Sequence, residues 1–297
     1  MTLFRRHGVI TVRDPTLYIG RMVMFLNACI FFAIIYVKCR DRVQDQVLAR
    51  VWLCLWHLGV PTNLAVVAVY AYNEEYFAIR REVKNGMLSP VAYMVANFGI
   101  QVPLMIIMSV FALSVSAYGI IDYNVDNYFS VLMVYAINLW VYERIAQLLS
   151  VSFNNPLMGM LMFLNTWFAS FLMNGILVAE SDVIWPFRAM FWMLPMKWCL
   201  RSFLYLEFSD SIFKGATLDS SAKGFTCGAD RKLQCYGVTG TQVLDSIGDN
   251  YKSIESKDNV SMDCMIMLII GGVFMIAYFV VLQIKTTKAK AVKLPTK

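Results

Sequence analysis

The sequence predicts an all-α membrane protein with six transmembrane helices, an amphipathic connecting helix and a large extracellular loop before the last span. Hydrophobic residues make up 59% of the 297 residues and charged residues 15%, against about 25% charged residues in soluble domains. Uncharged runs recur near the length of about 20 residues that spans a bilayer. They are residues 22–37, 51–73, 87–121, 127–142, 145–179 and 264–284. Lipid admits only helices or closed barrels, and these runs do not alternate as barrel strands do.

The first span is predicted at residues 20–37, after a basic stretch that contains Arg5, Arg6, Arg13 and Arg21. Basic residues of short flanking segments stay in the cytoplasm under the positive-inside rule, so we place the N-terminus there. This stretch has no apolar core before a small-residue cleavage site, and we expect no cleavable signal peptide. Residues 38–50 then form an outer loop, although their basic side chains run against the rule.

The second span is predicted at residues 51–72 and contains Pro61. A proline inside a helix kinks it and leaves a backbone carbonyl without its amide partner. His57 lies one turn earlier, and His7 is the only other histidine. We therefore expect His57 to be a packed, hydrogen-bonded side chain rather than a ligand, and we expect no metal site.

A densely charged hinge at residues 74–84 joins the second span to the third. Its members include the apolar Phe77, Ile79 and Val83 and the charged Arg80, Arg81, Glu82 and Lys84. This mixture predicts a short amphipathic helix that ends at Asn85-Gly86. A hinge between two spans lies on one face of the bilayer, where a soluble partner can contact it. Two interpretations stay open: a solvated connector, or a lever whose charged face docks into a partner while its apolar face packs on the spans.

The remaining spans are predicted at residues 88–121, 128–150, 157–179 and 263–285. Residues 180–262 form the large outer loop, in which an aromatic segment at 182–194 re-enters the membrane or lies at its outer interface. The C-terminal tail carries lysines and no acids, so both termini are expected in the cytoplasm. Residues 1–297 form one transmembrane domain in this prediction.

Signatures of nucleotide binding and hydrolysis are missing from the sequence. It contains no GxxxxGKS/T phosphate loop, no HExxH or GxSxG motif and no paired-cysteine zinc pattern. We nominate no catalytic residue, and we expect neither enzyme activity nor a bound cofactor in this chain by itself. An intramembrane enzyme would need a constellation that the sequence does not offer.

Two charge features bear on partners. The net charge of +6 is interpreted as membrane topology, because no polar domain large enough for a nucleic-acid groove is present. Glu143-Arg144 lies within the fourth span, where ionisable groups are functional candidates. Adjacent helical residues point about 100° apart, so we expect each of the two to meet another helix or the headgroup zone.

Seven cysteines are scattered along the chain, and only Cys227 and Cys235 lie together in a polar segment. We place this segment outside, where an oxidising environment permits a disulfide. Such a bond closes a small loop and contributes about 2–3 kcal/mol. The alternatives are two free thiols or competition for pairing by Cys264.

Several motifs in order resemble the G subfamily of ATP-binding cassette transporters, in its pleiotropic drug resistance form. They are Arg13-Asp14-Pro15, Arg81-Glu82, Gly86-Met87, Ala92-Tyr93, Val102-Pro103, Asn154-Asn155-Pro156, Trp185-Pro186-Phe187, Pro195-Met196-Lys197-Trp198 and Cys235-Tyr236. The resemblance implies a permease domain that alternates between inward- and outward-facing states and exports lipids or hydrophobic small molecules across the plasma membrane. ATP and Mg²⁺ would be bound by a nucleotide-binding domain, which is fused upstream or is a separate chain and is not recognised in this sequence. A second transmembrane half would complete the working unit in the lipid bilayer.

The resemblance also implies roles for individual residues. The coupling helix that receives the ATP-driven motion would contain Phe77, Arg80, Arg81, Glu82 and Lys84. A central substrate cavity between the second and fifth spans would be lined by Trp56, Asn63, Asn165, Phe168 and Phe171. Arg144 is an unusual charge for its place in the family pattern. The alternative function is a truncated, non-transporting membrane protein that acts as an interaction or regulatory partner of full-length transporters.

Overall fold

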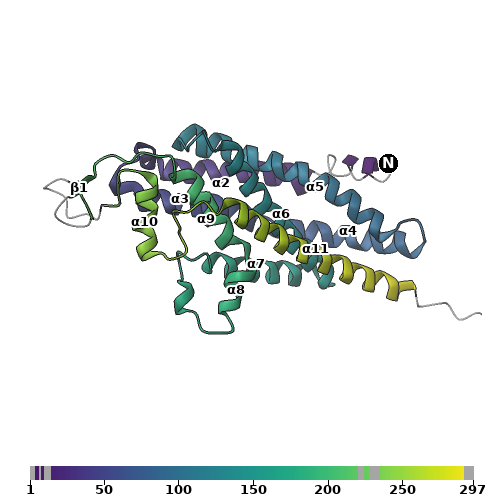
Figure 1. The fold of residues 1–297 in the computed structure, drawn as a ribbon. Helices are drawn as coiled ribbons and strands as arrows, with labels where there is room; N and C mark the ends of the chain where they lie inside the picture. Colours follow the sequence, from purple (N-terminus) through teal and green to yellow (C-terminus); the bar gives the residue numbers. More distant parts are fainter. Residues whose placement is uncertain (1–3, 7, 10–14, 220–223, 228–234, 291–297) are drawn as a thin grey trace, which may run out of the picture.

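The computed structural model describes residues 4–6, 8–9, 15–219, 224–227 and 235–290. These residues form an elongated helical bundle with one short antiparallel sheet (Figure 1). The elements are η1 (Pro15–Gly20), α2 (Arg21–Ile35), η2 (Val37–Asp41), η3 (Gln44–Gln46), α3 (Val47–Asn63), α4 (Val66–Lys84), α5 (Pro90–Leu113), η4 (Ser114–Ile121), α6 (Tyr128–Ser152), α7 (Pro156–Leu172), η5 (Glu180–Asp182), α8 (Arg188–Met193), α9 (Pro195–Phe208), β1 (Thr217–Asp219), β2 (Gly224–Thr226), α10 (Gly240–Asn250) and α11 (Val260–Lys290). The predicted all-α membrane class is confirmed.

Five helical segments in the described part of the chain are long and apolar enough to cross a bilayer. They are Tyr18–Ile35, Gln44–Lys84, Pro90–Ile121, Tyr128–Ser152 and Val260–Thr286. α7 is also apolar but has only 17 residues, the lower end of the roughly 17–25 that a span requires. The count of six spans therefore remains a prediction.

The bend between α3 and α4 has its origin in Pro61. Proline has no amide hydrogen, so the carbonyl of His57, four residues earlier, receives no helical hydrogen bond. That carbonyl instead accepts a hydrogen bond from Tyr135 Oη of α6 at 2.9 Å. Leu64 and Ala65 form the turn that separates the two helices. The freed carbonyl expected from the sequence is present, and the helix is interrupted three residues after Pro61.

The connecting helix is not a separate element. α4 begins at Val66 and continues without interruption to Lys84, so the charged hinge is the last part of a helix that starts near mid-span. The helix ends at Asn85-Gly86 as predicted, where Gly86 adopts a φ of +74°. A residue with a Cβ atom is strained in that conformation.

α7 ends at Leu172, seven residues before the predicted end of the fifth span at residue 179. Asn174 Oδ1 accepts hydrogen bonds from the backbone amides of Ile176 (2.7 Å) and Leu177 (3.1 Å). Gly175 follows with a φ of +87°. An Asn-Gly pair favours such turns, whereas the uncharged residues after it extended the hydropathy prediction too far.

The predicted outer loop also contains a helix of the bundle. α9 packs against α6, α11 and α3, and its Cys199, Phe203 and Leu204 are fully buried. Residues 195–200, 202–204 and 206–208 are buried, so α9 is enclosed by the bundle on nearly all sides. In contrast, Trp185 and Trp192 of the aromatic segment before it are exposed. Residues 180–262 are therefore a mixture of buried and exposed structure rather than one continuous loop.

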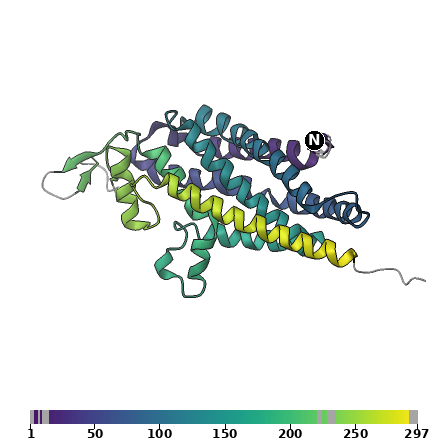
Figure 2. The same cartoon turned by 45° about the vertical axis from the view of Figure 1, so that its right-hand side comes forward.

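The two ends of the bundle differ in character. The sheet and α10 gather at one end, and the connection between α4 and α5 lies at the other with the end of α11 and residues 4–6 (Figures 1 and 2). α6 runs between these ends and contacts α4, α5, α7, α9 and α11. Most of the bundle therefore packs on α6.

Candidate functional site

The apolar face of the α4 end is fixed against three other helices. Tyr76, Ile79 and Val83 are buried one helical turn apart. They form a hydrophobic cluster with Tyr93 of α5, Val151 of α6, and Tyr278 and Leu282 of α11. Phe77 packs against the edge of this cluster. The last turns of α4 are thus anchored to the bundle and cannot move independently of it.

The opposite face of the α4 end presents charge to the surroundings. Arg80, Arg81 and Lys84 are exposed. Glu82 accepts hydrogen bonds from both terminal nitrogens of Arg6, one of them at 3.0 Å. The five residues predicted for the coupling helix therefore occupy one helix end, with three cations available to a partner.

A buried ion pair connects α2 and α6 at mid-bundle. Arg21 Nη2 lies 3.0 Å from Glu143 Oε2, and Arg21 Nη1 lies 3.3 Å from Glu143 Oε1. Tyr72 Oη of α4 donates to Glu143 Oε1 at 2.7 Å, while Tyr18 and Gln101 hydrogen-bond to the same hydroxyl. Arg21 and Glu143 are almost fully buried. The sequence indicated Glu143 as a buried charge but assigned Arg21 to the cytoplasmic flank.

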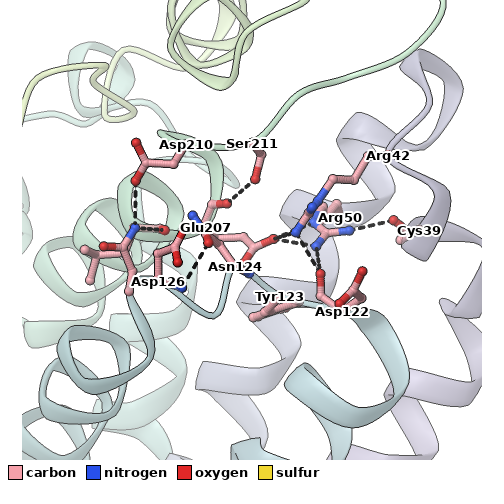
Figure 3. Close-up of polar contacts among 12 residues, drawn as sticks. Cys39, Arg42, Arg50, Asp122, Tyr123, Asn124, Asp126, Glu207, Asp210 and Ser211 are labelled. Carbon is pink, nitrogen blue, oxygen red and sulfur yellow. Dashed lines mark hydrogen bonds and ion pairs between the residues drawn. The ribbon is translucent and has the colours of Figure 1, made fainter.

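A second buried cluster holds the opposite end of the bundle together (Figure 3). Glu207 of α9 accepts a hydrogen bond from Arg50 Nε of α3 at 2.8 Å, and Arg50 Nη2 contacts the same oxygen. The other Glu207 carboxylate oxygen accepts from the Asn124 backbone amide at 3.0 Å. Arg50 also donates to the Cys39 and Asp122 carbonyls. The cluster joins α3, α9 and two connecting segments, and no sequence pattern predicted this pairing.

His57 lies beside this cluster. Its side chain is fully buried, and its Nδ1 is 3.2 Å from Tyr123 Oη. This matches the packed, hydrogen-bonded histidine expected from the sequence.

The residues predicted for a substrate cavity divide into two groups. Trp56 of α3 and Phe171 of α7 have ring centroids 5.6 Å apart, and Asn63 is a partly buried residue of α3 whose Oδ1 has no hydrogen-bond partner among the described residues. Asn165 and Phe168, by contrast, are exposed on α7. All five therefore lie on the neighbouring helices α3 and α7; three of them are partly buried, and the other two are exposed.

The family model of the ABC-2 type transporter matches residues 1–208. The chain belongs to the ABC-2 type transporter family. It is therefore an integral membrane protein and the permease component of an ABC transporter. The matched residues include the α4 end and both buried ion pairs. A search of curated proteins finds no match to the chain.

In this ABC-2 type permease, Cys227 and Cys235 are joined by a disulfide with Cα atoms 5.8 Å apart. Cys227 directly follows β2, which lies with β1 at the end of the bundle away from the α4 tip (Figure 1). The remaining cysteines are free; they are Cys29, Cys39, Cys54, Cys199 and Cys264.

Alkylation of the unfolded, unreduced permease is expected to label five of its seven cysteines. The disulfide protects the other two, which react only after reduction. Mass spectrometry of the intact chain counts the added groups, and the Cys227→Ser, Cys235→Ser double variant serves as the control with five labels under both conditions. Seven labels on the unreduced wild type contradict the disulfide.

Proposed function

We propose that this chain is the membrane-spanning half of an ATP-driven exporter of lipids or hydrophobic small molecules, of the G-subfamily, pleiotropic drug resistance type. A nucleotide-binding domain, fused upstream or carried by a separate chain, binds ATP and Mg²⁺ and hydrolyses the nucleotide. The α4 tip and both termini face the cytoplasm, and the protein resides in the plasma membrane. The polar segment with β1, β2 and α10 faces outward.

The observation that carries this proposal is the two-sided α4 end. Its cations Arg80, Arg81 and Lys84 are exposed, while Ile79 and Val83 are packed into the cluster with α5, α6 and α11. A domain that pulls on the charged face therefore also moves the three packed helices. ABC-2 permease domains work with nucleotide-binding domains, which supports such a partner here.

The exposed face of α7 supports a second transmembrane half. Leu157, Leu161 and Phe168 are exposed on this helix, and their spacing of four and seven residues places them on one stripe. Trp56 and Phe171 lie beside the stripe. A second half that covers α7 would enclose the predicted substrate residues between the two copies, since apolar pockets with few polar groups suit amphipathic ligands.

The test is the Arg81→Ala, Glu82→Ala double variant, expressed in place of the wild-type chain in the native cells. Loss of coupling is expected to lower ATP-dependent efflux of a fluorescent hydrophobic dye by roughly 5- to 150-fold, the usual range of coupling free energies. Folding is retained because the Arg6–Glu82 pair is solvent-exposed, and such pairs contribute about 0–1 kcal/mol.

The matched control replaces two exposed lysines at the far end of the bundle, Lys214→Ala and Lys252→Ala. Efflux in the control is expected to equal the wild type. Wild-type efflux in the Arg81, Glu82 variant contradicts the coupling role. Efflux that does not change when the wild-type chain is deleted favours the non-transporting alternative.

A further inference from the structure

Two apolar grooves lie in series where α5 and α11 pack over α6. The first has a volume of about 260 Å³ and is lined by Phe98, Val102 and Ile106 of α5, Ile137 and Trp140 of α6, and Leu268 of α11. The second, also about 260 Å³, lies closer to the α4 tip and is lined by α5 and α11 residues that include Val95 and Ile276. Only apolar side chains line either groove, and several of them are exposed. Both grooves therefore open to the hydrocarbon of the bilayer.

Arg144 lies behind the wall of the first groove that Phe98 and Trp140 form. It follows Trp140 by one helical turn on the same face of α6. The guanidinium carbon is 5.4 Å from the Trp140 ring centroid and 5.9 Å from that of Phe98. Both rings line the first groove, and they meet edge to face at 6.1 Å. The ring pair thus separates the guanidinium from the groove, and Phe98 is exposed enough to turn aside.

The charge of Arg144 is not compensated within the described part of the chain. The residue is only 2% exposed, its Nε and Nη2 have no hydrogen-bond partner, and no carboxylate forms an ion pair with it. Its neighbour Glu143 is directed to Arg21 instead. Trp140 Nε1 is also buried without an acceptor. The group that satisfies this site must therefore bring acceptor oxygens and negative charge.

The free-energy cost of an unpaired arginine inside a transmembrane helix indicates that Arg144 is neutralised by a group from outside the described chain. An arginine in the middle of a transmembrane helix is unfavourable by at least about 2.5–3.5 kcal/mol unless it is paired or reaches the headgroups. Arg144 is eight residues from the end of α6 at Ser152, which corresponds to about 12 Å along the helix. Its neighbour Glu143 pairs with Arg21, the first residue of α2, so Arg144 lies near the level where the first span begins, within reach of the phosphates of the leaflet at the α4 tip.

We propose that Arg144 and Trp140 bind the phosphate of an acidic phospholipid from the leaflet at the α4 tip, with an acyl chain lying in the α5–α6–α11 groove. The guanidinium fork matches a phosphate with two parallel hydrogen bonds. The groove continues from Arg144 toward mid-bilayer, which is the direction of the acyl chain of a lipid in that leaflet. Basic pockets between transmembrane helices bind acidic lipids by the same chemistry. The site is independent of ATP and of the transport proposed above.

The experiment measures lipid binding to the purified full chain in neutral detergent by native mass spectrometry, without nucleotide. Phosphatidylglycerol is expected to bind the wild type at least about 10-fold more tightly than phosphatidylcholine, a difference of about 1.4 kcal/mol. Arg144→Met is expected to abolish this preference. Arg188→Met, at an arginine whose side chain is 52% exposed, is the matched control and is expected to keep it. Equal preference in Arg144→Met and the wild type overturns the proposal.

A second variant tests the groove without removing the charge. Ala136 lines the first groove, and Ala136→Phe is expected to fill it and weaken phosphatidylglycerol binding by at least about 5-fold, near 1 kcal/mol. Undiminished binding in Ala136→Phe overturns the placement of the acyl chain. Thermal unfolding separates misfolding from loss of the site: phosphatidylglycerol raises the Tm of the wild type and of Arg188→Met, and it leaves the Tm of Arg144→Met unchanged. A Tm increase in Arg144→Met as large as in the wild type also overturns the proposal.

Discussion

Replacing Glu143 with leucine is expected to lower the free energy of unfolding by about 3–5 kcal/mol, the usual cost of removing one partner of a buried ion pair. Arg21 is left charged and almost fully buried, and the Tyr72 hydroxyl loses its acceptor. The adjacent Arg144 already lacks a carboxylate partner among the described residues, so the variant has two uncompensated cations at mid-bundle. Denaturant unfolding in detergent micelles measures the loss.

The control for this prediction is the Arg21→Met, Glu143→Leu double variant. Replacing both partners of a buried pair by apolar residues is often neutral or stabilising, so most of the stability is expected to return. Glu74→Leu is the matched substitution at an exposed glutamate of α4 and is expected to change stability by less than about 0.5 kcal/mol. A Glu143→Leu variant as stable as Glu74→Leu contradicts a structural role of the pair.

The second large effect is expected at Glu207. Glu207→Leu leaves Arg50 buried without its carboxylate, for an expected loss of about 3–5 kcal/mol. The Asn124 amide loses its acceptor as well, so the segment between η4 and α6 loses one of its ties to α9 and keeps the hydrogen bond from Asn127 Nδ2 to the Leu206 carbonyl. Hydrogen exchange in a peptide that covers residues 122–127 is expected to accelerate together with the fall in stability.

Two variants decide whether the Glu207 effect comes from the buried charge. Arg50→Met with Glu207→Leu is expected to recover most of the stability. Glu74→Leu, at the exposed glutamate of α4, is again the matched control and is expected to change stability by less than about 0.5 kcal/mol. Unchanged exchange at residues 122–127 in Glu207→Leu shows that this carboxylate does not hold the segment.

Hydropathy predicted the helices well because a span is defined by a local run of apolar residues. It also predicted both faces of the α4 end, since Ile79, Val83 and the neighbouring cations follow the helical period. Hydropathy could not predict which buried charges pair, because it uses only local sequence. Arg21 and Glu143 are 122 positions apart, and nothing in either segment identifies the other.

The errors also have physical causes. The predicted end of the fifth span ignored Asn174-Gly175, a turn signal that hydropathy does not register. α9 was included in an outer loop because Lys197, Arg201 and Glu207 lower its average hydropathy. Lys197 and Glu207 are nevertheless buried in ion pairs, and hydropathy cannot distinguish such residues from solvent-exposed ones. The substrate-cavity residues stay a prediction, because Asn165 and Phe168 are exposed on α7 and a cavity around them needs a second transmembrane half.

The Tyr135 hydroxyl makes the conformation of α3 around Pro61 depend on the position of α6. A bend maintained by backbone hydrogen bonds alone would be a property of that helix. Here the carbonyl released by Pro61 depends on a side chain of α6, the helix that also carries Glu143 and Arg144. Straightening α3 requires α6 to give up a hydrogen bond, and sliding α6 alters the curvature of α3. The shape of α3 and the position of α6 are therefore coupled through this hydrogen bond. α4, which carries the charged tip, follows α3 directly in the chain.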